Sequence, residues 1–137
     1  MDDAVIAVDP GREKCGLAVV GRTGEVFMKA VVATDRLPSV VAQLAALHRI
    51  ATVVIGNRTG SRAAAMAIAG GQPADRPLTI RTVDEHRSTD QARARYWRDN
   101  PPRGLARLIP VTLQVPPVPV DDYVAVILAE RFFARDI

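Results

Sequence analysis

Three acidic residues lie where the sequence changes from one expected element to the next. Asp9 follows an uncharged, β-branched run at residues 5–8. Glu85 follows the run at residues 78–83, and Asp121 opens the last apolar segment. Carboxylate oxygens are the ligands that Mg²⁺ and Mn²⁺ prefer, and two such ions can support hydrolysis of a phosphodiester. The three acids are therefore candidates for one shared metal site.

Each of these acids also has a simpler interpretation. Asp9-Pro10-Gly11 is a common turn sequence, and Glu85 is compatible with a solvated loop. Asp121 is a good N-cap for the helix that follows it. Asp84 and Asp122 adjoin two of the candidates and can take either role. Spacing alone leaves these alternatives open.

The expected elements bring the three acids to one end of a sheet. Strands are expected at residues 5–8, 17–20, 26–33, 52–56 and 78–83, and helices at about 38–49, 61–70, 88–98 and from 121 onward. The order βββαβαβαα predicts an α/β fold, with a five-stranded mixed sheet and helices on both faces. With the first strand central and the fourth and fifth on one side of it, the strand ends that carry Asp9 and Glu85 lie close together. A last helix that returns across the sheet would bring Asp121 to them.

Arginine dominates the basic residues of the chain. The formal net charge is only +3, but 16 of the 18 basic residues are arginines, since only Lys14 and Lys29 are lysines. Six arginines lie between His86 and Arg107, against two aspartates. Guanidinium groups suit phosphate oxygens and keep their charge. The cluster is typical of a phosphodiester-binding surface, although a solvated helix face has the same composition.

The residues that follow Glu85 are the best candidates to contact phosphate. Arg87, Ser88 and Thr89 lie at an expected helix N-terminus, where free N–H groups favour anions. The spacing of Ser88 and Gln91 also predicts a capping box, which would occupy the serine hydroxyl.

Two further pairs of residues have both a functional and a structural interpretation. Arg58 and Thr59 follow the expected strand 52–56 on the side of the carboxylates and can contact phosphate, although a loop arginine is commonly solvated. Tyr96 and Trp97 adjoin arginines and can stack on bases. Aromatic residues at helical spacing usually belong to the core, so we expect burial for this pair.

Composition places the chain in an ordinary class. Its 137 residues are 48% hydrophobic and 24% charged, which predicts one globular domain over residues 1–137. No run approaches the ~20 apolar residues of a membrane span, and the acidic start does not resemble a secretory signal. The single cysteine, Cys15, excludes an internal disulfide and fits a reducing compartment. We expect a cytoplasmic protein that does not bind membranes.

Four blocks of sequence carry a resemblance to a known family. They are residues 7–19 with Asp9-Pro10-Gly11, residues 53–56, residues 83–89 with Asp84-Glu85, and residues 120–128 with Asp121. In this order and spacing, over nearly the whole chain, they resemble the YqgF/RuvX family. These proteins are relatives of the Holliday junction resolvase RuvC and have an RNase H-like fold.

The resemblance implies a metal-dependent endonuclease that acts on structured nucleic acid and leaves a 5′-phosphate. Asp9, Glu85 and Asp121 would be its catalytic, metal-binding carboxylates, holding Mg²⁺ or Mn²⁺, as two ions. Its leading activity would be processing of the 5′ end of pre-16S rRNA, with resolution of branched DNA as the alternative. The expected substrate-binding residues are Lys14, Arg58, Arg87, Ser88 and Thr89.

The chain departs from the family pattern in several places. Lys14 and His86 stand where arginine is common, and the loop at residues 57–61 is short and has no proline. The segment at residues 101–119 contains six of the ten prolines and should form a loop, with residues 109–115 able to cover an apolar surface. In relatives the stretch before the last helix is often lysine-rich and mobile, whereas residues 108–120 are apolar here.

These departures keep other functions open. The apolar loop favours a non-catalytic module that docks on a protein partner, whereas the intact carboxylates favour an enzyme. A phosphate-binding turn like that of actin-type sugar kinases is disfavoured, because the chain is short for a two-lobed ATP cleft. Symmetrical cutting of a DNA junction would need a homodimer, while trimming of an RNA precursor would not.

Overall fold

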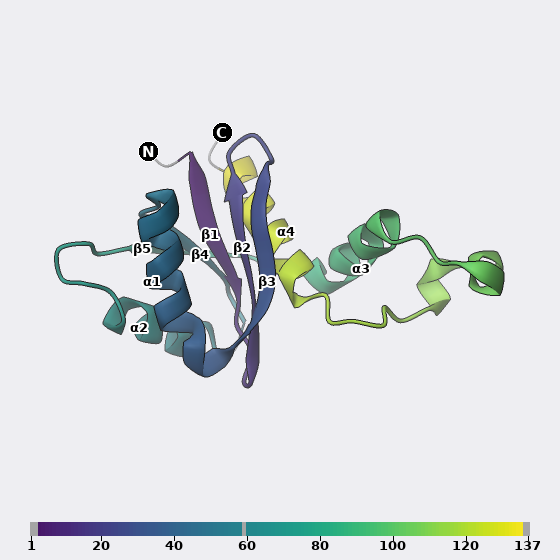
Figure 1. Cartoon of the computed structure of the whole chain (residues 1–137), viewed down its shortest axis with the longest axis horizontal. Coiled ribbons are helices and arrows are strands. Elements are labelled where there is room, and N and C mark those ends of the chain that lie inside the picture. The colour runs from purple at the N-terminus through teal and green to yellow at the C-terminus, as the bar shows by residue number, and fades with distance from the viewer. Residues whose placement is uncertain (1–2, 59, 136–137) are drawn as a thin grey trace.

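A five-stranded mixed sheet forms the centre of the protein (Figure 1). The computed structural model describes residues 3–58 and 60–135. The strands are β1 (Ala4–Asp9), β2 (Lys14–Gly21), β3 (Val26–Ala33), β4 (Thr52–Gly56) and β5 (Thr79–Val83), in the spatial order β3-β2-β1-β4-β5. β1 pairs antiparallel with β2 and parallel with β4. The predicted α/β architecture, with the first strand in the centre, is confirmed.

Helices cover both faces of this sheet, as predicted. α1 (Leu37–His48) and α2 (Ser61–Gly70) lie on one face, and α3 (Ser88–Asp99) and α4 (Asp121–Arg135) belong to the other. Among the described helices, none is long and apolar enough to cross a membrane.

Alternation along β1 decides which face its last residue meets. Successive side chains of a strand point to opposite faces. Ile6 and Val8 belong to the core under α1 and α2, whereas Val5 and Ala7 pack in the core under α4. Asp9 continues the second series, so its carboxylate points to the face that α4 covers.

Two glycines allow other elements to approach the end of β1 closely. Gly16, the register partner of Asp9 on β2, carries no side chain where the main chain of Asp121 rests on the sheet. A Cβ at this position would collide with the carbonyl group of Asp121. Gly56, at the end of β4, leaves the same kind of space for the carboxylate of Glu85. Both glycines are therefore required by close packing.

The segment between α3 and α4 projects away from the sheet (Figure 1). It contains two short 3₁₀ helices, at Gly104–Leu108 and Val111–Leu113. The amide of Gln114 donates hydrogen bonds to the carbonyls of Ala106 and Ile109, at 2.9 and 3.0 Å, so the segment folds onto itself. Its exposed large apolar residues are Leu105, Leu108, Ile109, Val111, Leu113, Val115 and Val118. Residues 109–115 therefore keep their large apolar side chains exposed, and their use as a surface for a partner stays a prediction.

The close approach at Gly16 predicts the effect of adding one methyl group. Gly16→Ala would force α4 away from β2 and should lower the free energy of unfolding by about 1–3 kcal/mol. Gly70→Ala is the matched control, since a Cβ in this last residue of α2 meets nothing within 4 Å. It should raise stability slightly, because alanine restricts the unfolded chain. Urea unfolding of both variants measures the difference, and equal stabilities would contradict the packing argument.

Candidate active site

Asp9 and Asp121 meet at the end of the central strand. Asp9 is the last residue of β1, and Asp121 is the first residue of α4. Because the main chain of Asp121 lies over Gly16, the register partner of Asp9, the first turn of α4 starts beside the Asp9 side chain. The expectation that the last helix returns to the end of the first strand is confirmed.

Glu85 reaches the same place from β5. Its side chain is 2% exposed and lies against Gly56. Asn57 holds the ends of β4 and β5 together. Its main-chain N–H donates a hydrogen bond to the Val83 carbonyl at 3.1 Å, and its side-chain oxygen accepts one from the main-chain N–H of Glu85 at 3.4 Å. Glu85 is thus a buried carboxylate on a fixed main chain, not a solvated loop acid.

The negative charges of Glu85 and Asp121 act on Asp9. Burial, followed by these two charges, raises the pKa of Asp9 to about 7, although Arg58 opposes the shift. Burial also raises the pKa of Glu85, and here too Arg58 opposes it. Asp9 is therefore close enough to the other two acids for their charges to change its titration.

Two of the predicted substrate-binding residues pair with these acids. Arg58 Nε lies 2.5 Å from Glu85 Oε1, and Lys14 Nζ lies 3.8 Å from Asp121 Oδ2. Both basic side chains are more than half exposed. They offset part of the negative charge while remaining accessible to an anionic ligand. Thr59, a further phosphate candidate, lies outside the described residues.

The donor set suits a divalent cation. Among residues 3–58 and 60–135, no three His, Cys, Asp or Glu side chains stand ready in the arrangement of a metal cluster. However, both carboxylate oxygens of Glu85 are buried and neither accepts a hydrogen bond of good geometry from the described part of the chain. The contact of Oε1 with Arg58 is an ion pair. Hard cations prefer such oxygens, and a cation would offset both the burial of the Asp9 carboxylate and its repulsion by Glu85 and Asp121. The three carboxylates thus fit Mg²⁺ or Mn²⁺.

The neighbouring acids Asp84 and Asp122 have other partners. Asp122 pairs with Lys29 at 3.3 Å and accepts a hydrogen bond from the N–H of Tyr123 at 2.9 Å. Asp84 accepts from the N–H of His86 at 3.1 Å in an exposed turn. These contacts favour Asp121 and Glu85 over their neighbours as the candidate ligands.

The capping box predicted for Ser88 and Gln91 does not form at the start of α3. Arg87 occupies the cap position with φ 59°, and Ser88 is the first helical residue. The Ser88 hydroxyl is buried and makes no hydrogen bond to the described residues, so it is not exposed to a ligand in this structure. Gln91 uses its side chain to accept a hydrogen bond from Arg131. Exposed Arg87 and half-buried Thr89 are free to meet a ligand at the helix N-terminus.

Sequence reasoning missed Arg131 of α4. Its guanidinium donates to the carbonyls of Asp84 and His86, both at 2.8 Å, and so holds the main chain on either side of Glu85. The only signal in the sequence is a basic residue that follows the apolar run at residues 123–129 of this helix. Tyr96 and Trp97, for which burial was expected, are both half-buried. Tyr96 packs against the core with its ring 5.9 Å from that of Tyr123.

Comparison with known proteins identifies the fold. Neither a protein-family model nor a curated protein matches the sequence. Among solved structures, RuvC of Thermus thermophilus in complex with a Holliday junction substrate matches at 18% identity and a TM-score of 0.59, over 98% of this chain and 96% of that one. A second T. thermophilus RuvC structure matches at 18% identity and a TM-score of 0.61, over 97% and 96%. The predicted RNase H-like fold is confirmed.

The raised pKa of Asp9 predicts how stability depends on pH. The folded protein holds the Asp9 proton up to about pH 7, whereas the ordinary value is 3.8. Without divalent cations, this contribution to stability is therefore complete below the ordinary value and is lost as pH rises through the folded value. Asp9→Asn removes the titration. At high pH the variant should be more stable than wild type, because it has no buried carboxylate that must ionise. We expect a gain on the order of 2 kcal/mol, less than the whole pKa shift of Asp9 would give, because the side chain is partly exposed to solvent.

Urea unfolding in EDTA at about pH 4 and about pH 8 measures this difference. Asp75→Asn, at an exposed residue in the loop before β5, is the control and should change neither value. The same difference between wild type and Asp9→Asn at both pH values would contradict the proposed coupling.

Proposed function

We propose that the chain is a divalent-metal-dependent nuclease that hydrolyses phosphodiester bonds in structured nucleic acid, with residues 1–137 as one catalytic domain. The observation that carries the proposal is the convergence of three acids at one end of the sheet: Asp121 rests on Gly16, the register partner of Asp9, and Glu85 lies against Gly56 at the end of β4. Bound Mg²⁺ or Mn²⁺, as two ions, would activate the attacking water and stabilise the leaving oxygen. The fold shared with RuvC supports this proposal.

In this proposal the protein supplies the ligands and the contacts to phosphate. Asp9, Glu85 and Asp121 hold the cation in their ionised forms, for which Asp9 must lose its proton. Arg58 and Lys14 pair with two of these acids in the protein alone. When the acids bind a cation instead, the two exposed basic groups can turn to the substrate phosphates. Arg87 and Thr89 add charge and N–H donors at the start of α3.

Two substrates are supported by different observations. The sequence blocks that resemble the YqgF/RuvX family favour the 5′ end of pre-16S rRNA. The structural likeness to RuvC in complex with a Holliday junction favours branched DNA as the second candidate. Branched DNA as the substrate would require a homodimer, because symmetrical cuts need two active sites related by a twofold axis.

A third function, as a non-catalytic docking module, is favoured by the exposed apolar residues of the segment 101–119. A docking function does not explain why the fold keeps three acidic residues close together despite their electrostatic repulsion. We therefore place it behind the nuclease.

A cleavage assay tests the proposed function. Wild type, Asp9→Asn and the control Asp75→Asn are each incubated with Mg²⁺ or Mn²⁺ and either a precursor-rRNA leader or a four-way DNA junction. We expect metal-dependent cutting that Asp9→Asn lowers by about 100-fold or more, a loss of at least about 2.7 kcal/mol of transition-state stabilisation. Asp75→Asn should cut like wild type.

The preferred substrate would decide between RNA processing and junction resolution. Absence of cutting on both substrates, in protein shown by calorimetry to bind Mn²⁺, would contradict the nuclease. Cutting by Asp9→Asn at the wild-type rate would remove Asp9 from the site.

A further inference from the structure

A group of basic residues lies along β5 and the C-terminal half of α4, next to Glu85 but separate from the carboxylates. We call it the basic ridge; its members are Arg81, His86, Arg87, Arg131 and Arg135. Arg81 comes from β5, which is an edge strand of the sheet. Arg81, Arg131 and Arg135 all lie outside the arginine-rich stretch between His86 and Arg107.

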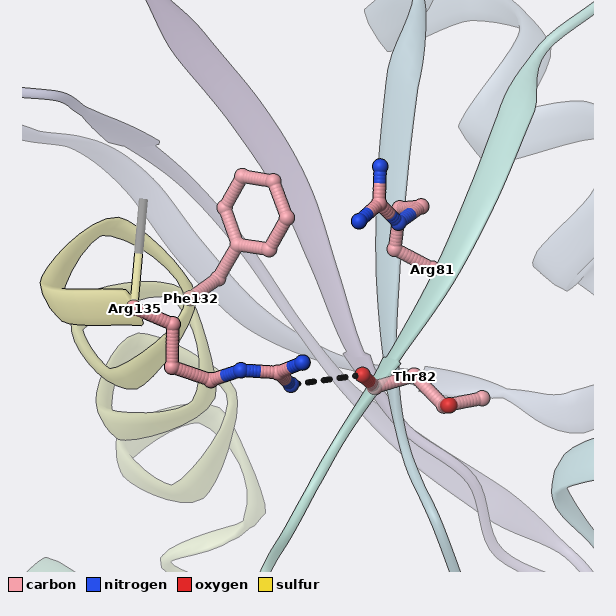
Figure 2. A pocket seen from close by; sticks show the side chains of 4 residues that line it. All are labelled: Arg81, Thr82, Phe132 and Arg135. Atoms are coloured by element: carbon pink, nitrogen blue, oxygen red, sulfur yellow. Dashed lines mark hydrogen bonds between the residues drawn. The ribbon is translucent and has the colours of Figure 1, made fainter. Parts of the chain in front are cut away.

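One end of the basic ridge contains a small pocket (Figure 2). Its volume is about 70 Å³, and it is lined by Arg81 and Thr82 of β5 and by Phe132 and Arg135 of α4. Arg135 donates a hydrogen bond to the Thr82 carbonyl at 3.2 Å, and the Arg81 guanidinium lies 6.0 Å from the centre of the Phe132 ring. Ligand pockets for drug-sized molecules measure roughly 300 Å³ or more. This pocket suits a group of phosphate size, not a nucleobase.

A second, more open pocket continues the ridge toward the carboxylates. Its volume is about 460 Å³, and Arg135 lines both pockets. His86, Arg87 and Arg131 line its other end, where Arg131 holds the main chain on either side of Glu85. Arg81 and Glu85 are only four residues apart in the chain, so the small pocket lies close to the carboxylate site.

The positive charge of the ridge is largely uncompensated. Arg131 and Arg135 donate to main-chain carbonyls, which orient their guanidinium groups without neutralising them. Within the described part of the chain, neither of them nor Arg81 forms an ion pair. Arg87 approaches the exposed Asp90 at 3.9 Å, a contact that water screens. Asp84 is the one acid among the residues that line the two pockets.

We propose that the basic ridge binds the phosphodiester backbone of a nucleic-acid arm that leads to the carboxylate site, with one phosphate seated between Arg81 and Arg135. This inference rests on the proposed function, since it gives the path of that substrate across the protein. The ridge presents a row of oriented guanidinium groups and ends in a pocket of phosphate size. Both features suit a surface that binds along a phosphodiester backbone. The recognition is of phosphate, so it applies to RNA and DNA alike.

Binding in EDTA tests the ridge without cleavage. The probes are a labelled four-way DNA junction and a labelled precursor-rRNA leader, titrated by fluorescence anisotropy at several salt concentrations. Arg81→Gln should weaken binding several-fold at low salt and reduce the slope of log K against log salt by about 0.9, the value for one lost phosphate contact. Arg81→Lys keeps the charge and should recover most of the slope.

Arg49→Gln is the matched control. Arg49 is an exposed arginine that follows α1, on the opposite face of the sheet, and its loss changes the net charge by the same amount. It should leave affinity and slope unchanged. Equal effects of Arg81→Gln and Arg49→Gln, or no effect of either, would overturn the proposal and leave Arg81 as a charge that protects an edge strand from pairing. Thermal unfolding confirms that each variant is folded.

The outcomes separate this inference from the proposed function. Binding that depends on Arg81, in a protein that cuts neither probe when metal is added, would support the ridge and contradict the nuclease. Metal-dependent cutting with a salt slope that Arg81→Gln does not change would support the nuclease and overturn the ridge.

Discussion

Repulsion among three carboxylates is the constraint that the rest of the structure has to satisfy. Asp9 ends β1, Glu85 follows β5 and Asp121 begins α4, and burial of Asp9 together with the charges of the other two acids raises its pKa to about 7. The sheet supplies the rigidity, since β1 lies between β2 and β4 and carries Asp9 at its end. Gly16 and Gly56 supply the space, because larger residues there would push away Asp121 and Glu85. The fold thus maintains an arrangement of like charges that a bound cation would stabilise.

Much of this arrangement follows from local sequence. The uncharged run before Asp9 predicts a buried central strand, and the alternation of apolar runs with helical periods predicts the order of elements. These signals are strong because burial on both sides of a strand and the 3.6-residue period are encoded residue by residue. The meeting of the acids also follows, because parallel neighbours β1, β4 and β5 end at the same edge of the sheet.

Contacts between distant segments could not be predicted in the same way. Arg131 acts on carbonyl groups about 45 residues earlier in the chain, which leaves no local pattern. The capping box at Ser88 failed because the chain enters α3 through Arg87 with a positive φ, so the serine lies one position too late to cap. The exposure of the apolar side chains of residues 109–115 could not be predicted either, because it depends on Gln114, which closes the segment onto its own carbonyls. In each case a side chain could form its hydrogen bonds with several partners, and only the tertiary structure determines which partner it contacts.

The central claim is that the three acids form a cation site, and diffraction from crystals soaked in Mn²⁺ tests it most directly. We expect one or two anomalous difference peaks bounded by the carboxylates of Asp9, Glu85 and Asp121, with Arg58 displaced from Glu85. A map without a peak at these acids, at a Mn²⁺ concentration that saturates binding in solution, would contradict a cation site there. Persistence of the Arg58–Glu85 ion pair in that map would show that the arginine is the permanent partner of the buried acid.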